Sequence, residues 1–154
     1  MSDKFSLSGK VIVVTGGTGI LGNSFVNGIV EAGGAVGILG RNEAVAEERA
    51  AAIDANGGKA IALVADVMNM NDLVAAKNKI VDAFGKVDGL VNGAGGNMPQ
   101  GVLQPEEDIF SMNLQGMKEV MELNLWGTLY PTQVFGEAIA QNGKGSIVNI
   151  SSMN

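Results

Sequence analysis

The residues with the clearest capacity for chemistry in this sequence are clustered glycines. Residues 15–22 read Thr-Gly-Gly-Thr-Gly-Ile-Leu-Gly, directly after a β-branched run at 10–15 and before apolar residues at helical spacing. Glycine tolerates the positive φ angles of a tight turn and lets the backbone approach a ligand closely. The helix that follows offers free N–H groups and the positive end of its dipole to an anion. The motif predicts a phosphate-binding loop, with a purely structural turn as the alternative.

The composition excludes several other kinds of chemistry. The chain of 154 residues has no cysteine and no histidine, which rules out disulfides, thiol nucleophiles, zinc clusters and histidine-based triads. The formal net charge is −6 and only two residues are arginine, so nucleic acid is not expected as a partner. No run of about 18 apolar residues occurs and the N-terminus lacks a signal-peptide core. These features predict no membrane association and a cytoplasmic location.

Strand and helix patterns alternate along the whole chain. Short apolar runs typical of buried parallel strands occur at 10–15, 35–39, 60–64, 87–92 and 145–151. Helices are predicted over 20–32, 43–55, 71–84, 116–123 and 124–140, with Asn71 as the N-cap of the third and Gly85 as its end. Residues 93–112 are glycine-rich and aperiodic, which indicates a long functional loop. The order predicts an α/β fold, a Rossmann-type doubly wound parallel sheet in a single domain spanning residues 1–154.

Five motifs, each at the end of an expected element, make the chain resemble the short-chain dehydrogenase/reductase family. Besides the glycine loop, they are Asp-Val at 66–67, Asn-Gly-Ala-Gly at 92–95, Leu-Asn-Leu-Trp-Gly-Thr at 123–128 and Ile-Val-Asn-Ile-Ser-Ser at 147–152. The resemblance covers essentially the whole chain. It implies an NAD(P)-dependent oxidoreductase that transfers a hydride between a nicotinamide cofactor and a carbonyl or secondary alcohol.

The resemblance also assigns residues to the cofactor. The pyrophosphate would lie on the loop backbone, at Gly16, Thr18, Gly19, Ile20 and Gly22. Asp66 would accept a hydrogen bond from the adenine amino group beside the Val67 backbone, with a simple turn after the third strand as the alternative. Asn92, Ala94 and Gly95 would line the adenosine and ribose side of the site, with a purely structural turn as the alternative for Gly95.

The end of the second strand bears on the choice of cofactor. NAD sites usually place a carboxylate there, whereas NADP sites prefer a nearby arginine. Here the strand is followed by Gly40 and Arg41, and a guanidinium can bind a 2′-phosphate through two hydrogen bonds. Arg41 therefore predicts NADP over NAD. The alternative is a solvated arginine on the first turn of a helix.

Two catalytic positions follow from the resemblance. Asn124 is a polar residue in an apolar helical stretch, where asparagine disfavours helix geometry. In the family, this asparagine distorts the helix and holds a water of the proton relay; an asparagine facing solvent is the alternative. Ser152, the second serine of its pair, would hydrogen-bond the substrate carbonyl or alcohol oxygen, with Ser151 as its structural partner and as the alternative assignment. Trp126, Met117 and Met121 are expected in the helix core and not in a cofactor-binding site.

Three features depart from the family pattern. Ile20 stands where most members have glycine, a spacing more typical of the epimerase-like branch, and Gly93 replaces an asparagine. The family's Tyr-x-x-x-Lys pair is absent, because Tyr130 is the only tyrosine and Val134 follows it four residues later. The chain thus resembles the N-terminal, cofactor-binding portion of such an enzyme. It is expected to be inactive as a reductase, and to self-associate or be marginally stable because its last strand lies at an edge.

Substrate and assembly are expected from the resemblance alone. The long loop at 93–112 is similar to that of members acting on sugar acids, of the D-mannonate/fructuronate and gluconate type. A homo-oligomer, a dimer or a tetramer, is expected. Two other functions remain open: a non-catalytic dinucleotide-binding module, and an epimerase or dehydratase. The glycine spacing favours the latter, and the Asn124 motif and the final strand oppose it.

Overall fold

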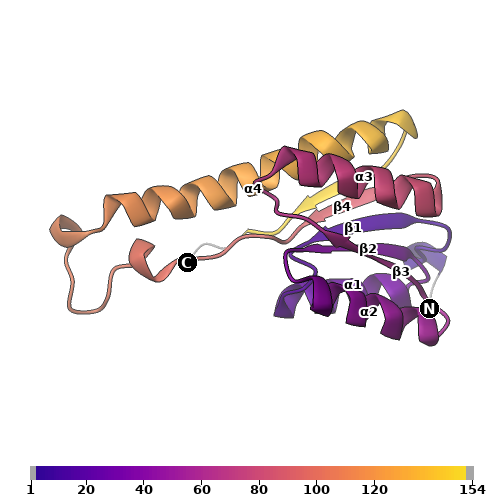
Figure 1. The fold of residues 1–154 in the computed structure, drawn as a ribbon, viewed down its shortest axis with the longest axis horizontal. Helices are drawn as coiled ribbons and strands as arrows, with labels where there is room; N and C mark the ends of the chain where they lie inside the picture. Colours follow the sequence, from indigo (N-terminus) through magenta and orange to yellow (C-terminus); the bar gives the residue numbers. More distant parts are fainter. Residues whose placement is uncertain (1–2, 152–154) are drawn as a thin grey trace.

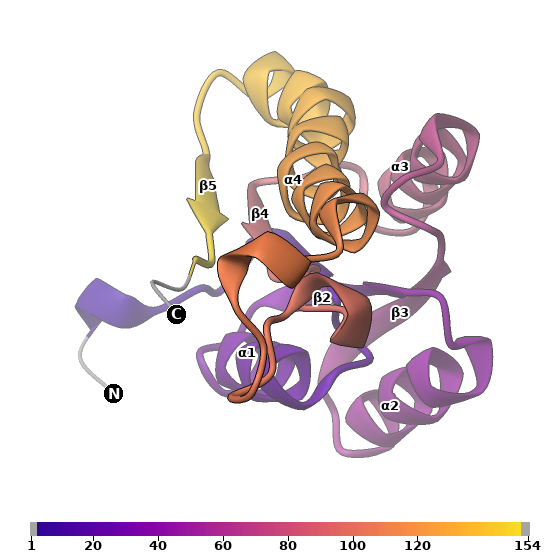
Figure 2. The same ribbon diagram turned by 90° about the vertical axis from the view of Figure 1, so that its left-hand side faces the viewer.

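The computed structural model describes residues 3–151, which form a five-stranded parallel sheet with helices on both faces (Figure 1). In spatial order the strands are β3 (Lys59–Val64), β2 (Ala35–Gly40), β1 (Val11–Thr15), β4 (Gly89–Asn92) and β5 (Ser146–Asn149). The α-helices of the described residues are α1 (Ile20–Glu31), α2 (Glu43–Ala55), α3 (Met70–Phe84) and α4 (Leu114–Gln141). Helices α1 and α2 cover one face, and α3 and α4 cover the other (Figure 2). The predicted doubly wound sheet is confirmed.

The central strands are buried on both faces. All residues of β2 and all but one of β1 are buried, because they are small or apolar. Phe135, Leu73 and Ile80 belong to the core between the sheet and α3 and α4, whereas Val26 and Ile38 belong to the core beneath α1 and α2. Burial on both sides is the physical reason why these strands appear in the sequence as continuous apolar runs.

The carboxyl ends of the parallel strands lie together at one end of the sheet. Thr15 is in register with both Leu39 of β2 and Asn92 of β4, and Asn92 is in register with Asn149 of β5. The chain runs outward from β1 to β3 and then returns to β4 on the other side of β1. Open parallel sheets bind ligands outside the carboxyl ends of their strands, at the point where the strand order reverses.

Residues 114–141 form one helix, so the prediction of two helices meeting at Asn124 is wrong. The Asn124 side-chain amide donates to the Val120 carbonyl at 2.8 Å, and the Thr128 hydroxyl donates to the Asn124 carbonyl at 3.0 Å. Polar side chains here bond to the backbone one turn away without interrupting the helix. The helix break expected at Asn124 is therefore not found.

The first half of α4 extends beyond the sheet (Figure 1). Met117, Met121 and Trp126 lie on this extension and are 37%, 59% and 42% exposed, so their prediction as core residues is wrong. Trp126 stacks instead on Tyr130, with ring centroids 5.5 Å apart. The helical spacing of Met117, Met121 and Trp126 is typical of a buried helix face, but no other element of the described residues covers this face of α4.

The loop that precedes α4 is irregular, as predicted, apart from two short 3₁₀ turns at Pro99–Gly101 and Ile109–Ser111. The N-cap of α3 is Asn69 and not Asn71. The Asn69 side-chain oxygen accepts from the N–H groups of Asn71 and Asp72. Gly85 ends that helix at a φ of 79°, as expected.

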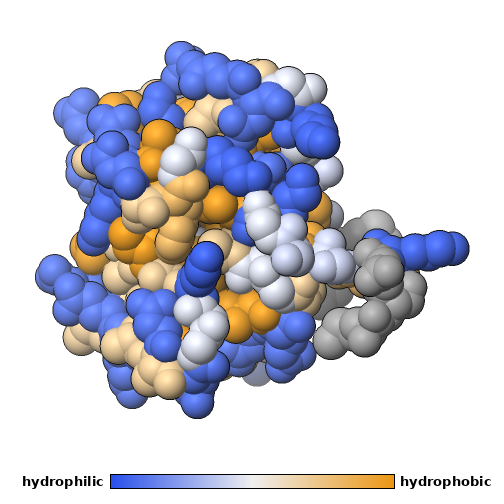
Figure 3. Space-filling view, turned by 90° about the vertical axis from the view of Figure 1, so that its right-hand side faces the viewer, coloured by the Kyte–Doolittle hydropathy of each residue, from blue (hydrophilic) through white to orange (hydrophobic). Residues whose placement is uncertain are grey.

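Asp88 is a buried carboxylate that directly precedes β4, at the end of the sheet where the strands begin. The surface at that end of the molecule carries hydrophilic side chains interspersed with apolar ones (Figure 3). It accepts the Val11 N–H at 2.9 Å and pairs with Lys86 at 2.9 Å and Lys10 at 3.6 Å. Burial raises the pKa of the Asp88 carboxyl. The hydrogen bonds from Lys86 and Val11 and the two lysine charges outweigh burial and hold that pKa below its ordinary value of 3.8.

We expect Asp88→Asn to lower the free energy of unfolding by about 1.5–3 kcal/mol at pH 7, because it removes charged hydrogen bonds. The pKa of Asp88 is lower in the folded chain than in the unfolded chain, where it is near 3.8. The ionised carboxylate therefore stabilises the fold above about pH 3.8, and this stabilisation is lost as pH falls through the folded-state pKa. The difference between wild type and variant should therefore shrink below about pH 4. Urea titrations at several pH values measure the free energy of unfolding of both chains. Asp82→Asn, on the exposed face of α3, is the control. A difference that does not vary with pH would contradict this account.

Candidate functional site

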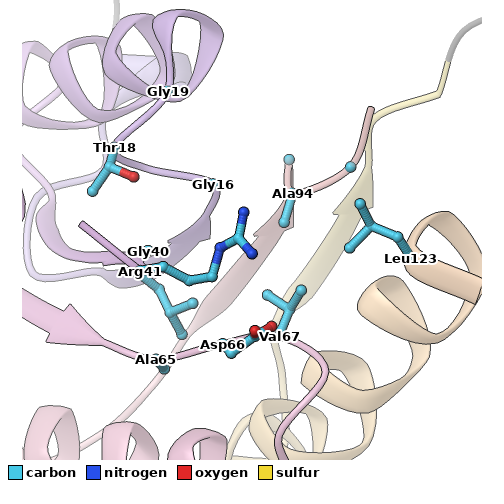
Figure 4. Close-up of a pocket in the computed structure, with 13 residues that line it drawn as sticks. Gly16, Thr18, Gly19, Gly40, Arg41, Ala65, Asp66, Val67, Ala94 and Leu123 are labelled. Carbon is cyan, nitrogen blue, oxygen red and sulfur yellow. The ribbon is translucent and has the colours of Figure 1, made fainter. Parts of the chain in front are cut away.

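A cleft of about 240 Å³ lies at the carboxyl ends of β1, β2, β3 and β4 (Figure 4). Its walls come from the end of β2, from the segments that follow these strands and from one residue of α4. The lining residues are Gly16, Thr18, Gly19, Leu39, Gly40, Arg41, Ala65, Asp66, Val67, Gly93, Ala94, Gly95 and Leu123. The cleft is therefore at the point of the sheet where ligands are expected.

The loop between β1 and α1 forms one wall through its backbone. Gly16 has a φ of 68°, and a Cβ there would lie 2.7 Å from the Gly93 carbonyl oxygen. A Cβ on Gly22 would overlap the Gly16 carbonyl oxygen, so the first turn of α1 packs directly on the loop. Gly19 is the N-cap of α1, and no side chain caps this helix. The N–H groups of its first turn are therefore available to an anion.

Most of the predicted cofactor-binding residues come together here. Eight of the eleven line the cleft, namely Gly16, Thr18, Gly19, Arg41, Asp66, Val67, Ala94 and Gly95. The other three do not. The Ile20 side chain is 90% exposed at the start of α1, Gly22 is buried behind the loop, and Asn92 is buried in the sheet.

Arg41 and Asp66 lie on neighbouring walls of the cleft and bring opposite charges to it (Figure 4). Arg41 makes no hydrogen bond or ion pair with any other residue of the described part, and its side chain is exposed. One Asp66 carboxylate oxygen accepts the Met68 N–H at 2.9 Å, which is the turn proposed as its alternative role. Its other oxygen has no donor among residues 3–151, so the turn leaves it free to accept a ligand N–H.

Polar contacts at the ends of β1 and β4 fix the loop that follows β4. The buried Thr15 hydroxyl accepts from the N–H groups of Gly93 and Ala94, both at 3.1 Å. The Asn92 side-chain amide donates to the Thr132 hydroxyl at 2.9 Å and to the Asn149 side chain at 2.8 Å. Asn92 thus links β4, β5 and α4 beneath the cleft through its amide, whereas its buried side-chain oxygen has no partner among the described residues.

Asn124 is held against the same loop. Its side-chain oxygen accepts the Gly96 N–H at 3.1 Å, and its amide donates to the Gly96 carbonyl at 2.8 Å. This pair of bonds fixes the glycine turn beside the cleft, so Asn124 does not simply face solvent. Ser152, the other predicted catalytic residue, lies outside the described residues.

The family model for short-chain dehydrogenases matches residues 10–154. The chain belongs to the short-chain dehydrogenase family. An uncharacterized oxidoreductase, UxuB of Bacillus subtilis (strain 168), is 35% identical over 97% of this chain and 56% of its own length. The 2-dehydro-3-deoxy-D-gluconate 5-dehydrogenase of Escherichia coli (strain K12) is 34% identical, with the same coverage of both chains.

A solved structure from Haemophilus influenzae, provisionally assigned as a D-mannonate oxidoreductase and holding NAD, superposes with a TM-score of 0.85. It is 32% identical over 97% of this chain and 57% of its own. This short-chain dehydrogenase chain therefore spans about half the length of the curated relatives it matches.

Five further residues of this short-chain dehydrogenase line the cleft without being predicted: Leu39, Gly40, Ala65, Gly93 and Leu123. Gly40 and Ala65 are next to predicted residues, and Gly93 and Leu123 lie within motifs, so extending each prediction by one position would have found these four. Leu39 lies two positions before Arg41, within β2. Arg49 is different, because it lies in the middle of α2 and nevertheless contacts the glycine loop. No group of acidic side chains within residues 3–151 is arranged to hold a metal ion.

Proposed function

We propose that the cleft is the nicotinamide-dinucleotide site of an oxidoreductase that transfers a hydride between the cofactor and a carbonyl or secondary alcohol. The observation that supports this most directly is the glycine loop with the uncapped start of α1 beside the cleft. Backbone N–H groups and a helix dipole at this place in a parallel sheet suit a pyrophosphate.

In this proposal each wall of the cleft binds one part of the cofactor. The loop and the first turn of α1 donate hydrogen bonds to the pyrophosphate. Asp66 accepts a hydrogen bond from the adenine amino group beside Val67, and Ala94 and Gly95 border the ribose. When bound, the nicotinamide supplies or accepts the hydride. Ser152 would hydrogen-bond the substrate oxygen.

We further propose that NADP is preferred over NAD. Gly40 occupies the strand end where a carboxylate would bind a ribose hydroxyl, and the neighbouring Arg41 has no partner among the described residues. A free guanidinium beside the cleft suits a 2′-phosphate. The relative from Haemophilus influenzae holds NAD, so the preference has to be measured on this chain.

Calorimetric titrations with NADP⁺ and NAD⁺ test both proposals. We expect tighter binding of NADP⁺, and Arg41→Ala should lose about 1.5–3 kcal/mol of that preference, the contribution of a charged hydrogen bond. Lys79→Ala, which removes an exposed positive charge from α3, is the control. Equal or tighter binding of NAD⁺, unchanged in Arg41→Ala, would overturn the preference for NADP. Binding of neither dinucleotide would overturn the proposed site.

We propose a sugar acid, of the D-mannonate/fructuronate or gluconate type, as the substrate class. The support is the long loop at 93–112 together with the names of the relatives from Escherichia coli and Haemophilus influenzae.

We also propose a homo-oligomer. Exposed apolar side chains along the first half of α4, including Leu114, Met121 and Leu125, support it. Sedimentation equilibrium would measure the assembly.

A further inference from the structure

Arg49 holds the glycine loop from the side of α2. Its Nη1 donates to the Gly17 carbonyl at 2.6 Å and to the Gly19 carbonyl at 3.1 Å. No carboxylate of the described residues lies within ion-pair distance of its guanidinium. The positive charge is therefore directed to two loop carbonyls and is not neutralised by an acidic partner.

Binding these two carbonyls fixes the orientation of two peptide units. In a trans peptide the C=O and the following N–H point in opposite directions. The Gly17 carbonyl shares its peptide with the Thr18 N–H, and the Gly19 carbonyl shares its peptide with the Ile20 N–H. Bonds from Arg49 to the two oxygens therefore turn both N–H groups away from α2.

Those two N–H groups have no other role in the described structure. Neither the Thr18 N–H nor the Ile20 N–H has an acceptor within residues 3–151. Thr18 and Gly19 line the cleft, and Ile20 is the first residue of α1. The Gly19 N–H between them donates to the Gly16 carbonyl at 2.9 Å, so Thr18 and Ile20 offer the unpaired donors of this turn. Backbone N–H groups of such a turn can form an anion-binding concavity. A cation hydrogen-bonded to the carbonyl also polarises the peptide and strengthens its N–H as a donor.

We infer that Arg49 is a positioning residue for the pyrophosphate: it orients and polarises the Thr18 and Ile20 N–H groups without touching the ligand. This inference rests on the proposed dinucleotide site. It explains why an arginine is half-buried behind the loop, whereas Arg41, exposed at the cleft, has a different task.

The inference makes a prediction specific to phosphate. Arg49→Met keeps the apolar stem and removes the donors, so it should weaken binding of ADP about tenfold and change binding of adenosine less than twofold. Arg49→Lys keeps the charge and a donor, and should restore ADP binding to within about threefold of wild type. Calorimetry on the 154-residue chain gives both constants, circular dichroism verifies folding, and Lys79→Ala is the control.

Three results would overturn the inference: unchanged ADP binding in Arg49→Met, equal weakening of ADP and adenosine, or no rescue by lysine. If Arg49→Met does not fold, Arg49→Lys decides: ADP binding up to about threefold weaker than wild type with unchanged adenosine binding supports the inference, and equal weakening of both ligands overturns it. A wild-type chain that binds neither ligand would refute the proposed dinucleotide site. A wild-type chain that binds both, with no effect at Arg49, would refute this inference alone.

Discussion

Replacing Gly16 by valine is expected to abolish dinucleotide binding, with a loss of at least about a hundredfold in affinity, while the chain stays folded. Gly16 has a φ of 68°, where an L-residue costs roughly 1–2 kcal/mol, and a β-branched residue is a genuine outlier. The added Cβ would also lie 2.7 Å from the Gly93 carbonyl oxygen. The loops after β1 and β4 would have to separate, and both line the cleft.

The matched control is Gly28→Val. Gly28 lies on the exposed face of α1, and a Cβ there meets nothing within 4 Å. This variant should bind NADP⁺ as the wild type does. Calorimetry measures binding, and thermal unfolding shows whether Gly16→Val remains folded. Normal binding by a folded Gly16→Val chain would mean that the glycine turn is only structural.

The second large effect concerns turnover. The 154-residue chain is expected to bind the cofactor without reducing a carbonyl, because it carries no Tyr-x-x-x-Lys pair to supply the proton. General acid–base catalysis alone is typically worth about 10²–10⁴-fold in rate. The assay follows oxidation of NADPH and of NADH with a panel of sugar-acid ketones. The Escherichia coli 2-dehydro-3-deoxy-D-gluconate 5-dehydrogenase, assayed on 2-dehydro-3-deoxy-D-gluconate with both nicotinamide cofactors, is the positive control.

Turnover at a rate comparable to the control would contradict this expectation. It would mean that another group of this chain supplies the proton. Tyr130→Phe would then test the only tyrosine directly. The variant loses the hydroxyl group but keeps the ring that stacks on Trp126. Loss of turnover in that variant would assign the proton to the Tyr130 hydroxyl.

The strands and the glycine loop were predictable from the sequence because their signals are local. A strand buried on both faces must be apolar throughout, as β2 is, and the conformation of Gly16 admits few residues other than glycine. The order of the elements then determines which loops meet at the switch point. This is why Asp66 and Arg41, which are 25 residues apart, could both be assigned to one cleft.

The errors concern properties that depend on tertiary structure. Asn124 is a poor helix residue in isolation, but hydrogen bonds to Val120 and Gly96 accommodate it within α4. Met121 has the spacing of a core residue, yet the sheet does not extend far enough to cover it. Arg49 contacts loop carbonyls 30 and 32 residues away, and no local pattern reports such a contact.

Amide hydrogen exchange with and without NADP⁺ tests the central claim most directly, because it reports where the dinucleotide binds. The Thr18 and Ile20 N–H groups have no acceptor within the described residues and should exchange fast in the free chain. With NADP⁺ bound, we predict protection at residues 16–22, at Arg41 and at Val67, and none in the 99–111 segment. Bound NADP⁺ that leaves residues 16–22 unprotected would contradict the assignment of this cleft.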